Sequence, residues 1–387
     1  MSNTLKLKEC CTIIAGQSPE SKYYNTEGIG IPFFQGKADF GDVYPRIRVY
    51  CSQPTKIAEK DDILLSVRAP VGPTNLSPGK VCIGRGLTAI RPTTKLNLRY
   101  LLYYFKFFEV QLQQKGTGTT FKAITQDIIK NLEIPVPPIP EQERIVSKIE
   151  ELFSKLDASV AELQTAKEKL KVYRQAVLKE ALTPEQGWCK CCFSDLMESV
   201  RNGYGKKPDD KGEYRILRIS SVRPGKVELS DFRCNQTPFD ANDLISENDL
   251  LFTRYNGSLE YVGVCACVPQ LQEKYAYPDK IIKCTPKLKN SYHSRFLQYS
   301  MNQGEARKFI RSKIKTTSGQ KGIAGSDIKK VVLWLPELPV QEKIVKMIDE
   351  KMSTCDNIEQ IIDRSLQQAE ALRQSILKQA FEGELAT

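Results

Sequence analysis

The chain has 387 residues, of which 41% are apolar, and it carries a formal net charge of +11 at pH 7. This length suffices for two or three domains, and the apolar fraction lets both halves of the chain build cores. No apolar run reaches the length of a membrane span, and no basic region followed by an apolar stretch opens the chain. We therefore expect a soluble, cytoplasmic protein with no membrane partner.

The excess of positive charge favours a polyanionic partner, although charge alone does not identify one. The twelve cysteines do not follow the spacing of a zinc site, because Cys10 and Cys11 are adjacent, as are Cys191 and Cys192. Zinc ligands are usually separated by two or more residues and occur in repeated pairs. Since His293 is the one histidine, we expect reduced thiols that lie mostly in cores, no metal and no cofactor.

Residues 1–134 are predicted to form a globular domain around a small, irregular sheet. Short β-like runs in this segment are separated by Gly, Pro and Asn, which is typical of strands joined by turns. These runs are 31–34, 43–49, 62–67 and 80–83. Apolar and aromatic residues at helical spacing over 96–114 predict a helix that packs on this sheet, and a polar loop is expected at 117–120.

Residues 135–182 predict a long helix that begins after a run of prolines. Proline is tolerated in the first turn of a helix and forbids helix upstream, so the prolines at 135–140 fix where it starts. No Pro or Gly interrupts residues 141–181, so the helix runs for about 40 residues, or roughly 60 Å. Its apolar residues alternate steps of four and three, as in the seam of a coiled coil. The predicted seam is Ile145, Ile149, Leu152, Leu156, Ser159, Leu163, Ala166, Leu170, Tyr173 and Val177.

The second half of the chain repeats this plan. Residues 183–335 resemble 1–134 weakly, and a helix over 291–313 takes the place of the one at 96–114. Residues 340–380 then match residues 141–181 without a gap, at an offset of 199 positions. The second seam, in which Lys351 and Ser365 are the polar misfits, is Ile344, Ile348, Lys351, Cys355, Ile358, Ile362, Ser365, Ala369, Leu372 and Ile376. A seam this long needs a partner, and the simplest partner is the other copy.

Basic residues in the two globular segments are mixed with Gly, Asn and aromatic residues. Arg, Lys and Asn can hydrogen-bond base edges and phosphates, and glycine-containing turns such as 202–207 and 254–258 can approach a groove closely. For each residue the alternative interpretation is a solvated surface charge. The DNA-binding candidates are Lys37, Arg46, Arg48, Arg68, Arg85, Tyr204, Lys206, Lys207, Arg218, Arg254, Tyr255 and Asn256.

No catalytic site can be assembled from the sequence. It contains neither a GxGxxG loop after a strand nor a GxxxxGK[ST] phosphate loop, and it lacks the Asn/Asp-Pro-Pro-Tyr/Phe element of amino-methyltransferases. A Ser-His-Asp or Cys-His arrangement would depend wholly on His293. We therefore predict that this chain is not an enzyme.

Two diverged globular segments, each followed by a proline-led Gln-Glu helix start (138–143 and 338–342) and a repeated long helix, resemble the specificity subunit of type I restriction-modification systems. The resemblance covers essentially the whole chain. It implies an α+β fold with an internal pseudo-two-fold repeat, in which the two long helices form an antiparallel coiled coil. It divides the chain into α/β target-recognition domains at 1–134 and 183–335, a central conserved helix at 135–182 and a distal conserved helix at 336–382.

The resemblance also implies a function. The chain would recognise a bipartite, asymmetric site in double-stranded DNA, with the helices setting the gap. Modification subunits, usually two, would carry S-adenosylmethionine and methylate adenine, and restriction subunits would hydrolyse ATP and cut. Two alternatives stay open at this stage: a coiled-coil adaptor that binds proteins without DNA specificity, and an enzyme with an unrecognised site.

Overall fold

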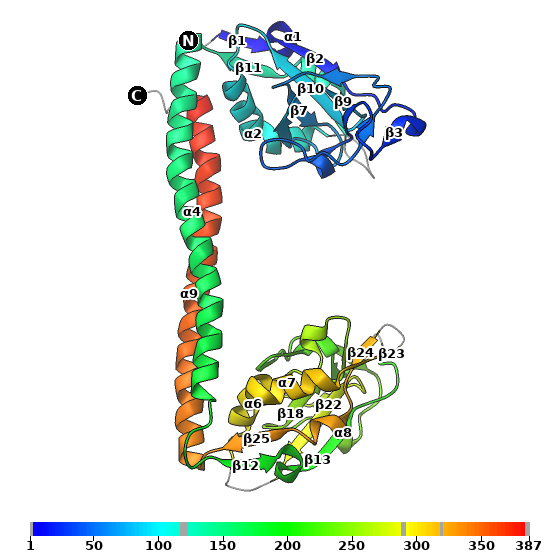
Figure 1. Ribbon diagram of the computed structural model, residues 1–387, viewed down its shortest axis with the longest axis vertical. Coiled ribbons are helices and arrows are strands. Elements are labelled where there is room, and N and C mark those ends of the chain that lie inside the picture. The colour runs from blue at the N-terminus through cyan, green and yellow to red at the C-terminus, as the bar shows by residue number, and fades with distance from the viewer. Residues whose placement is uncertain (1–2, 117–122, 210, 288–291, 318–319, 384–387) are drawn as a thin grey trace. The chain divides into compact units, whose positions relative to one another are not determined.

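The computed structural model describes residues 3–116, 123–209, 211–287, 292–317 and 320–383, so the polar loop predicted at 117–120 lies outside the described residues. The chain divides into two compact units. Unit 1 comprises Met1–Gln164 with Ile362–Thr387, and unit 2 comprises Thr165–Ile361. Each unit contains a globular α/β part and segments of two long helices, α4 (Ile139–Ala181) and α9 (Leu338–Glu382) (Figure 1).

The globular part of unit 1 is built on two small sheets. The first is antiparallel, in the order β2 (Cys11–Ala15), β10 (Leu87–Pro92), β7 (Ile63–Ser66) and β8 (Thr74–Leu76). The second has the order β3 (Tyr24–Asn25), β5 (Tyr50–Cys51), β4 (Ile31–Phe34), β9 (Val81–Ile83) and β6 (Ile57–Ala58). A separate ladder of β1 (Asn3–Lys6) and β11 (Glu133–Val136) leads into α4, and the short helices are α1 (Leu7–Cys10) and α3 (Gln126–Lys130).

The strands predicted at 31–34, 62–67 and 80–83 are confirmed as β4, β7 and β9. The strand predicted at 43–49 is wrong, because these residues form a loop. Pro45 has no backbone N–H to donate to a neighbouring strand, and the apolar side chains of Val43 and Ile47 are exposed.

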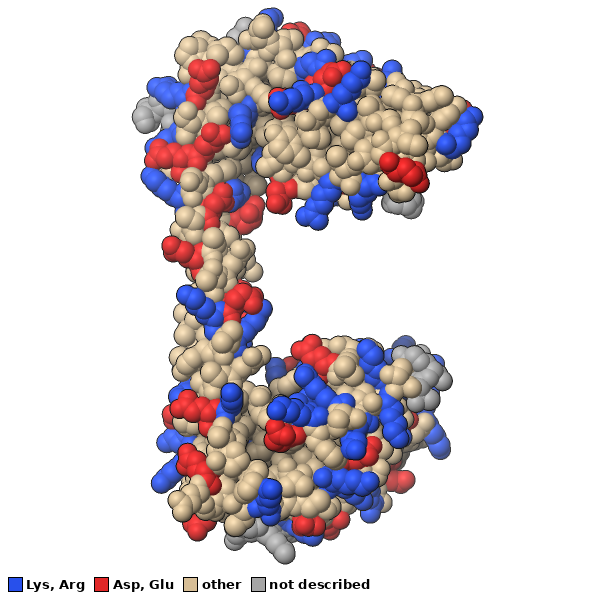
Figure 2. Space-filling view, in the orientation of Figure 1, with Lys and Arg blue, Asp and Glu red and all other residues tan. Residues whose placement is uncertain are grey.

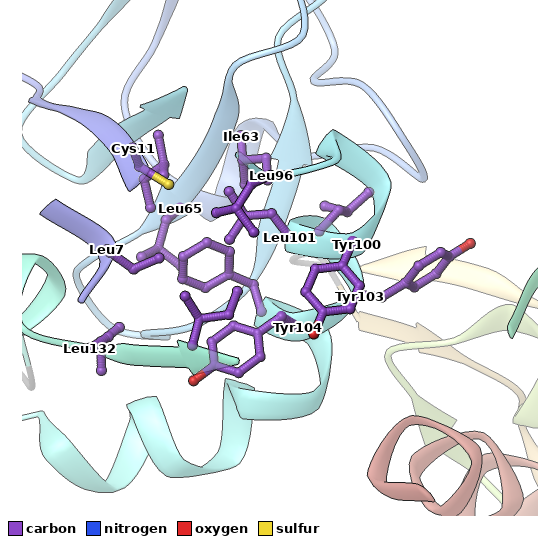
Figure 3. Packing of buried hydrophobic residues seen from close by; sticks show 14 of the residues in the cluster. Leu7, Cys11, Ile63, Leu65, Leu96, Tyr100, Leu101, Tyr103, Tyr104 and Leu132 are labelled. Carbon is purple, nitrogen blue, oxygen red and sulfur yellow. The ribbon is translucent and has the colours of Figure 1, made fainter. Parts of the chain in front are cut away.

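Helix α2 (Leu98–Lys115) covers the first sheet of unit 1 and confirms the helix predicted at 96–114. The side chain of Asn97 begins it, because its Oδ1 accepts hydrogen bonds from the backbone N–H groups of Arg99 and Tyr100 (2.8 and 3.1 Å). Tyr100 and Leu101 are buried with Leu7, in the cluster that Figure 3 shows. Burial of such side chains supplies the main stabilisation of this unit, at about 1.5–3 kcal/mol each.

Unit 2 repeats this arrangement. Its main sheet has the same strand order, with β13 (Met197–Asn202), β22 (Ile281–Pro286), β18 (Leu250–Thr253) and β20 (Cys265–Cys267). The ladder that leads into α9 is β12 (Cys189–Cys192) with β25 (Val332–Leu335). The helix predicted at 291–313 is instead two helices, α6 (Ser294–Asn302) and α7 (Gly304–Lys313), because the chain turns at Gly304 with φ +55°.

Smaller elements complete unit 2. A three-stranded sheet consists of β17 (Phe232–Asn235), β14 (Tyr214–Leu217) and β21 (Tyr275–Ala276). Another consists of β19 (Tyr255–Asn256), β24 (Gln320–Gly322) and β23 (Lys315–Thr317). Two further strands, β15 (Val222–Arg223) and β16 (Lys226–Val227), pair with each other, and the short α-helices are α5 (Phe193–Leu196) and α8 (Gly325–Ile328).

The internal repeat extends to single backbone positions. Asp61 and Asn248 both have a positive φ (67° and 68°) in the turn before β7 and β18. The next residues, Asp62 and Asp249, are each 1% exposed. Each aspartate accepts a 2.8 Å hydrogen bond from the backbone N–H three residues upstream. The two globular parts therefore use one scaffold despite their low identity.

A buried glutamine fixes each globular part to its long helix. In unit 1, Gln142 of α4 accepts a hydrogen bond from the backbone N–H of Asn97 (2.8 Å) and donates to Pro137 O (2.8 Å). In unit 2, Gln341 of α9 accepts a hydrogen bond from the backbone N–H of His293 (2.9 Å) and donates one to Pro336 O (2.8 Å). An ion pair also repeats between the two units. Arg99 of α2 pairs with Glu150 of α4 in unit 1, and Arg295 of α6 pairs with Asp349 of α9 in unit 2.

The long helices run antiparallel within each unit, which confirms the predicted coiled coil. In unit 2, Lys167 pairs with Glu359 (3.6 Å) while Arg174, further along α4, pairs with Asp356 (2.5 Å), earlier along α9. In unit 1, the α4 segment Ile139–Gln164 packs its apolar side chains with Ile376 near the end of α9. No helix in the part of the chain that the structure describes is long and apolar enough to cross a membrane.

The predicted seam is right in part. The positions that repeat every seven residues from Ile149 and from Ile348 are shielded, and so is Ile145, which lies between them in the pattern. The predicted positions that the structure leaves exposed are Ser159, Ala166, Tyr173, Ile358 and Leu372. The shielded residues at the intervening positions are Phe153, Val160, Lys167 and Arg174 on α4 and Met352, Glu359, Leu366 and Arg373 on α9. Several of them are charged, with stems that cover apolar surface while their heads form ion pairs. At four of these positions the predicted residue is the less polar neighbour of a charged, shielded one, as Tyr173 is of Arg174.

Candidate nucleic-acid interface

Three loops of unit 1 meet at one end of its sheets. Arg85 lies in a tight turn in which Gly84 N donates to Phe34 O (2.8 Å) and Gly86 O accepts from Val67 N (2.9 Å). A Cβ on Gly86 would lie 2.1 Å from Gln35 O, so only glycine allows this backbone approach. The structure thus brings the exposed side chains of Arg68, Arg85 and Lys37 onto neighbouring loops.

Arg46 and Arg48 lie on the loop that follows. Arg48 Nη2 donates to Asp39 Oδ1 (2.5 Å) and to Ala38 O (2.7 Å), so its charge is balanced and it braces the loop. The backbone of Arg46 donates to Asp39 O (2.7 Å), and its side chain is exposed. Arg46 is therefore better placed than Arg48 to meet an external anion.

The equivalent end of unit 2 gathers a second group of candidates. Arg254 N donates to Lys280 O (2.9 Å), which repeats the bond from Val67 to Gly86 in unit 1. Tyr204 N donates to Tyr277 O (2.8 Å) and its carbonyl accepts from Asp279 N (2.9 Å). Tyr204 and Arg254 therefore flank the turn that contains Asp279 and Lys280.

Tyr255 and Asn256 lie beside Arg254 on β19, which pairs with β24. The guanidinium of Arg254 lies 4.8 Å from the centroid of the Tyr255 ring. A Cβ on Gly322 would lie 2.4 Å from Tyr255 Cδ1, so the ring packs directly over this glycine. A half-buried aromatic ring, a cation and an amide are thus held together on a paired strand.

The remaining candidates are less closely tied to this group. Arg218 follows β14, whose parallel pairing with β21 directs it toward the same end, and its Nε lies 3.7 Å from Asp231 Oδ1. Lys206 and Lys207 are exposed in the loop after Tyr204. Arg218 is thus partly balanced by a carboxylate, whereas the two lysines extend the basic surface.

Sequence reasoning missed three lysines that strand pairing brings to this place. Lys321 lies opposite Asn256 in the β19–β24 ladder, and Lys315 lies opposite Gly322 in the β23–β24 ladder. Lys280 is exposed in the turn beside Arg254. In the sequence, a Ser-Gly pair between two short polar runs is a turn signal that could have drawn attention to Lys315 and Lys321, but not to their neighbours across the sheet. Figure 2 shows Lys and Arg side chains over the globular part of unit 2, with Asp and Glu interspersed.

Unit 2 also contains buried ionisable groups, of which Asp249 lies at the other end of strand β18 from Arg254. Burial raises the pKa of Asp249, although the backbone N–H of Ser246 and the hydroxyl of Thr285 lower it in part. Burial lowers the pKa of Lys283, whose Nζ donates to Leu244 O (2.6 Å). In unit 1 the equivalent Asp62 instead receives two hydrogen bonds from a guanidinium, that of Arg91.

No group of three or more His, Cys, Asp and Glu side chains that could hold a metal ion occurs among the residues for which coordinates are described. The cysteines of those residues are free thiols. The two sheet ends offer hydrogen-bond donors, cations and, in unit 2, the packed rings of Tyr204 and Tyr255. Such groups suit recognition of an anionic, base-bearing ligand.

The sequence matches the family described as the type I restriction modification DNA specificity domain over residues 2–168 and 185–367. The chain belongs to this specificity family. The two matches coincide with the two halves of the internal repeat, so each half carries one specificity domain. The fold class predicted from the resemblance is thereby confirmed.

Curated relatives agree with the family. The chain is 33% identical over 327 residues to the type I restriction enzyme EcoKI specificity subunit of Escherichia coli K12, covering 80% of this chain and 70% of that protein. It is 27% identical to the StySPI specificity subunit of Salmonella potsdam, with the same coverages.

Solved structures of specificity subunits are also similar. The HsdS subunit from Thermoanaerobacter tengcongensis matches with a TM-score of 0.38 at 47% identity, over 40% of this chain and 38% of that chain. The type I S subunit from M. genitalium matches with a TM-score of 0.40 at 14% identity, over 98% of this chain and 96% of that chain.

Proposed function

We propose that this chain is the DNA-recognition subunit of a type I restriction-modification complex. It reads a bipartite, asymmetric site in double-stranded DNA and directs adenine methylation or restriction by partner subunits. The observation that carries this proposal is that one scaffold occurs twice and bears different side chains at equivalent positions. A duplicated scaffold with unlike surfaces suits two unlike half-sites.

Antiparallel backbone pairings show which positions of the two units are equivalent. Arg68 pairs with Ala123 in unit 1, and Tyr255 pairs with Gly322 in unit 2, at the same point of the same scaffold. Arginine matches the O6 and N7 acceptors of guanine, whereas the neighbouring Asn256 can hydrogen-bond both edge groups of adenine. Lysines such as Lys321 suit phosphates, which fix position without reading sequence.

In this proposal the partner subunits, and not this chain, catalyse methylation and DNA cleavage. Modification subunits, two per chain because the recognition unit is duplicated, supply S-adenosylmethionine and methylate adenine, and restriction subunits hydrolyse ATP and cut the DNA. Methylation requires the target base to leave the stack, so the recognised duplex must tolerate distortion. The exposed apolar side chains of Tyr173, Ile358 and Ile361 on the helices of unit 2 offer a modification subunit a surface to cover. The chain acts in the cytoplasm, with the cell's DNA.

The assignment of half-sites can be tested by methylome sequencing of cells that express this chain with a modification subunit. The double variant Arg68→Ala with Arg85→Ala should change or relax one half-site only. The double variant Tyr255→Ala with Asn256→Ala should change the other half-site only. Lys169→Ala, on the exposed face of α4, serves as the control and should leave both intact. Changes in both half-sites from either double variant would contradict the proposal.

DNA binding itself can be separated from the adaptor alternative by its salt dependence. Each phosphate contact contributes close to one unit to the slope of log K against log salt. Lys280→Ala with Lys321→Ala should therefore reduce that slope by about two. Absence of any binding to duplex at low salt, with the modification subunit present, would favour the protein adaptor.

The gap between the half-sites is proposed to follow the length of the paired helices. Insertion of one heptad into both α4 and α9 keeps the seam in phase. It should lengthen the unspecified gap in the methylated motif and leave the bases of each half-site unchanged. Altered half-site bases with an unchanged gap would rule out this ruler.

A further inference from the structure

One loop of unit 2 departs from the shared scaffold. Gly72 N donates to Ser66 O (3.0 Å) in unit 1, and Gly263 N donates to Thr253 O (2.7 Å) in unit 2, so these bonds close equivalent loops. The first loop contains five residues, 67–71, and the second contains nine, 254–262. The additional four residues follow directly after the candidate residues Tyr255 and Asn256.

The longer loop is held in place from beneath by a buried arginine. Arg307 of α7 is 9% exposed, and its guanidinium donates to Val262 O (2.9 Å) and Glu260 O (2.7 Å). Burial lowers the pKa of Arg307 to about 10, so the group remains a cation at neutral pH and keeps both bonds. Gly263, with φ +68°, lets the loop close against α7, because a Cβ there would lie 2.5 Å from Ile310.

Two more contacts shape the far side of the loop. Asn256 Oδ1 accepts a hydrogen bond from Ser258 N (2.9 Å), which forms a tight turn. The guanidinium of Arg223 lies 5.0 Å from the centroid of the Tyr261 ring. The loop is therefore braced at both of its ends and across its base.

This braced loop displays an apolar side chain. Leu259 is 47% exposed, within a few residues of Arg254 and of the ladder that carries Lys321. The cations of Arg254 and Lys321, at the base of the loop, attract phosphates and thereby bring the stacked bases toward this side chain. Proteins that bend DNA use such apolar side chains as wedges between base steps, with cations on both sides.

We propose that Leu259 inserts between two neighbouring base pairs of the half-site read by unit 2 and unstacks them. This inference rests on the proposed function of the chain. The equivalent loop of unit 1 cannot supply the same wedge, because it has no counterpart of residues 257–260 and its Val71 is buried. A base step that unstacks easily, such as a pyrimidine–purine step, is the expected target.

Unstacking can be read directly with 2-aminopurine, whose fluorescence rises when stacking is lost. Duplexes with the methylated motif would carry the probe at each position of the unit 2 half-site in turn, and would be bound to the complex of this chain with its modification subunit. The wild-type complex should raise the fluorescence several-fold at one step besides the methylated adenine. Leu259→Ala should abolish this increase, and Leu259→Met should retain it. The control Val332→Ala, at an exposed position of β25, should leave it unchanged.

The outcomes separate the inference from the function on which it rests. An unaltered fluorescence increase in Leu259→Ala, or the lack of any increase besides that at the methylated adenine in the wild type, overturns the wedge while DNA recognition stands. Failure of the wild-type complex to bind or methylate any duplex overturns the proposed function itself. Arg307→Lys, which keeps the charge but loses the paired bonds, should lower the fluorescence increase at the same step and leave that at the methylated adenine intact.

Discussion

Arg174 and Asp356 form an ion pair between α4 and α9 in unit 2, with Nη2 2.5 Å from Oδ1, and Arg373 and Asp157 form the equivalent pair in unit 1. Each arginine and each aspartate is separated from its counterpart by the same 199 positions. Arg174 and Asp157 both lie on α4, and each pairs with the α9 copy of the other, Asp356 and Arg373. An antiparallel pairing of two like helices requires this exchange. Because both arginines stand at seam positions, these pairs help to specify how the helices align.

Reversal of one charge in this pair should destabilise unit 2. Arg174→Glu places a third carboxylate beside Asp356 and Glu359, and should lower the free energy of unfolding by about 1–2 kcal/mol, of which Asp356→Arg in the same chain should restore about 1 kcal/mol. Urea unfolding measures both. The control Glu168→Lys, which breaks an exposed pair with Lys171, should cost less than about 0.5 kcal/mol. If Arg174→Glu and Glu168→Lys lower the free energy of unfolding equally, the pair of Arg174 with Asp356 stabilises the helices no more than an exposed pair does.

The corrected seam predicts opposite outcomes for two neighbouring residues. Leu170→Ala removes a buried side chain and should cost about 2–4 kcal/mol. Tyr173→Ala lies at a position that the apolar pattern assigned to the seam, but its exposed side chain should cost less than about 1 kcal/mol. Thermal unfolding of the chain without partners distinguishes them. A larger loss for Tyr173→Ala would restore the seam predicted from periodicity.

The buried glutamine at the start of α4 should be intolerant of an apolar replacement of the same length. Gln142→Met leaves the N–H of Asn97 and the carbonyls of Pro137 and Lys95 without their partner. Unsatisfied buried groups cost about 1–3 kcal/mol each, so the loss should be at least about 2 kcal/mol. The control Gln175→Met, on the exposed side of α4, should be nearly neutral. Unfolding by denaturant compares the two, and a neutral Gln142→Met would refute the role assigned to this side chain.

Asp249 should make the stability of unit 2 depend on pH in the acid range. Its pKa is raised by burial in the folded state, so the folded state binds more protons than the unfolded state between the ordinary aspartate pKa of about 3.9 and the raised value. The contribution of Asp249 to stability is therefore greatest below this window and falls as pH rises through it.

Asp249→Asn removes that dependence, because the amide does not ionise and still accepts the hydrogen bond from Ser246 N. The free energy of unfolding of the variant minus that of the wild type should therefore be larger at pH 7 than at pH 4. Urea unfolding at both pH values measures this difference. Asp240→Asn, an exposed replacement in the same unit, controls for the loss of one carboxylate. A wild-type advantage that grows from pH 4 to pH 7 would contradict the stated direction of the shift.

The repeated long helices and three strands of the first domain, β4, β7 and β9, could be predicted from the sequence, because they depend on local patterns. An uninterrupted heptad-like repeat, prolines at its start and a gapless second copy leave few alternatives to two paired helices. Runs such as 62–67 are apolar, short and bounded by turn residues. A single residue interrupted each of two predicted elements. Pro45 prevents the strand predicted at 43–49, and the turn at Gly304 divides the helix predicted at 291–313 into two.

The candidate interface depended on contacts between residues far apart in the sequence. Strand pairing places Lys321 opposite Asn256 and Lys280 beside Arg254, and no local pattern encodes either relationship. Tyr173 was assigned to the seam in place of Arg174 because a charged side chain can be shielded through its stem and its ion-pair partner, which the periodicity of apolar residues does not register. The sequence by itself determined that two copies of one unit exist and that each ends in a long helix. Only the tertiary structure decided which side chains each copy presents together, since that follows from pairing and packing across the chain.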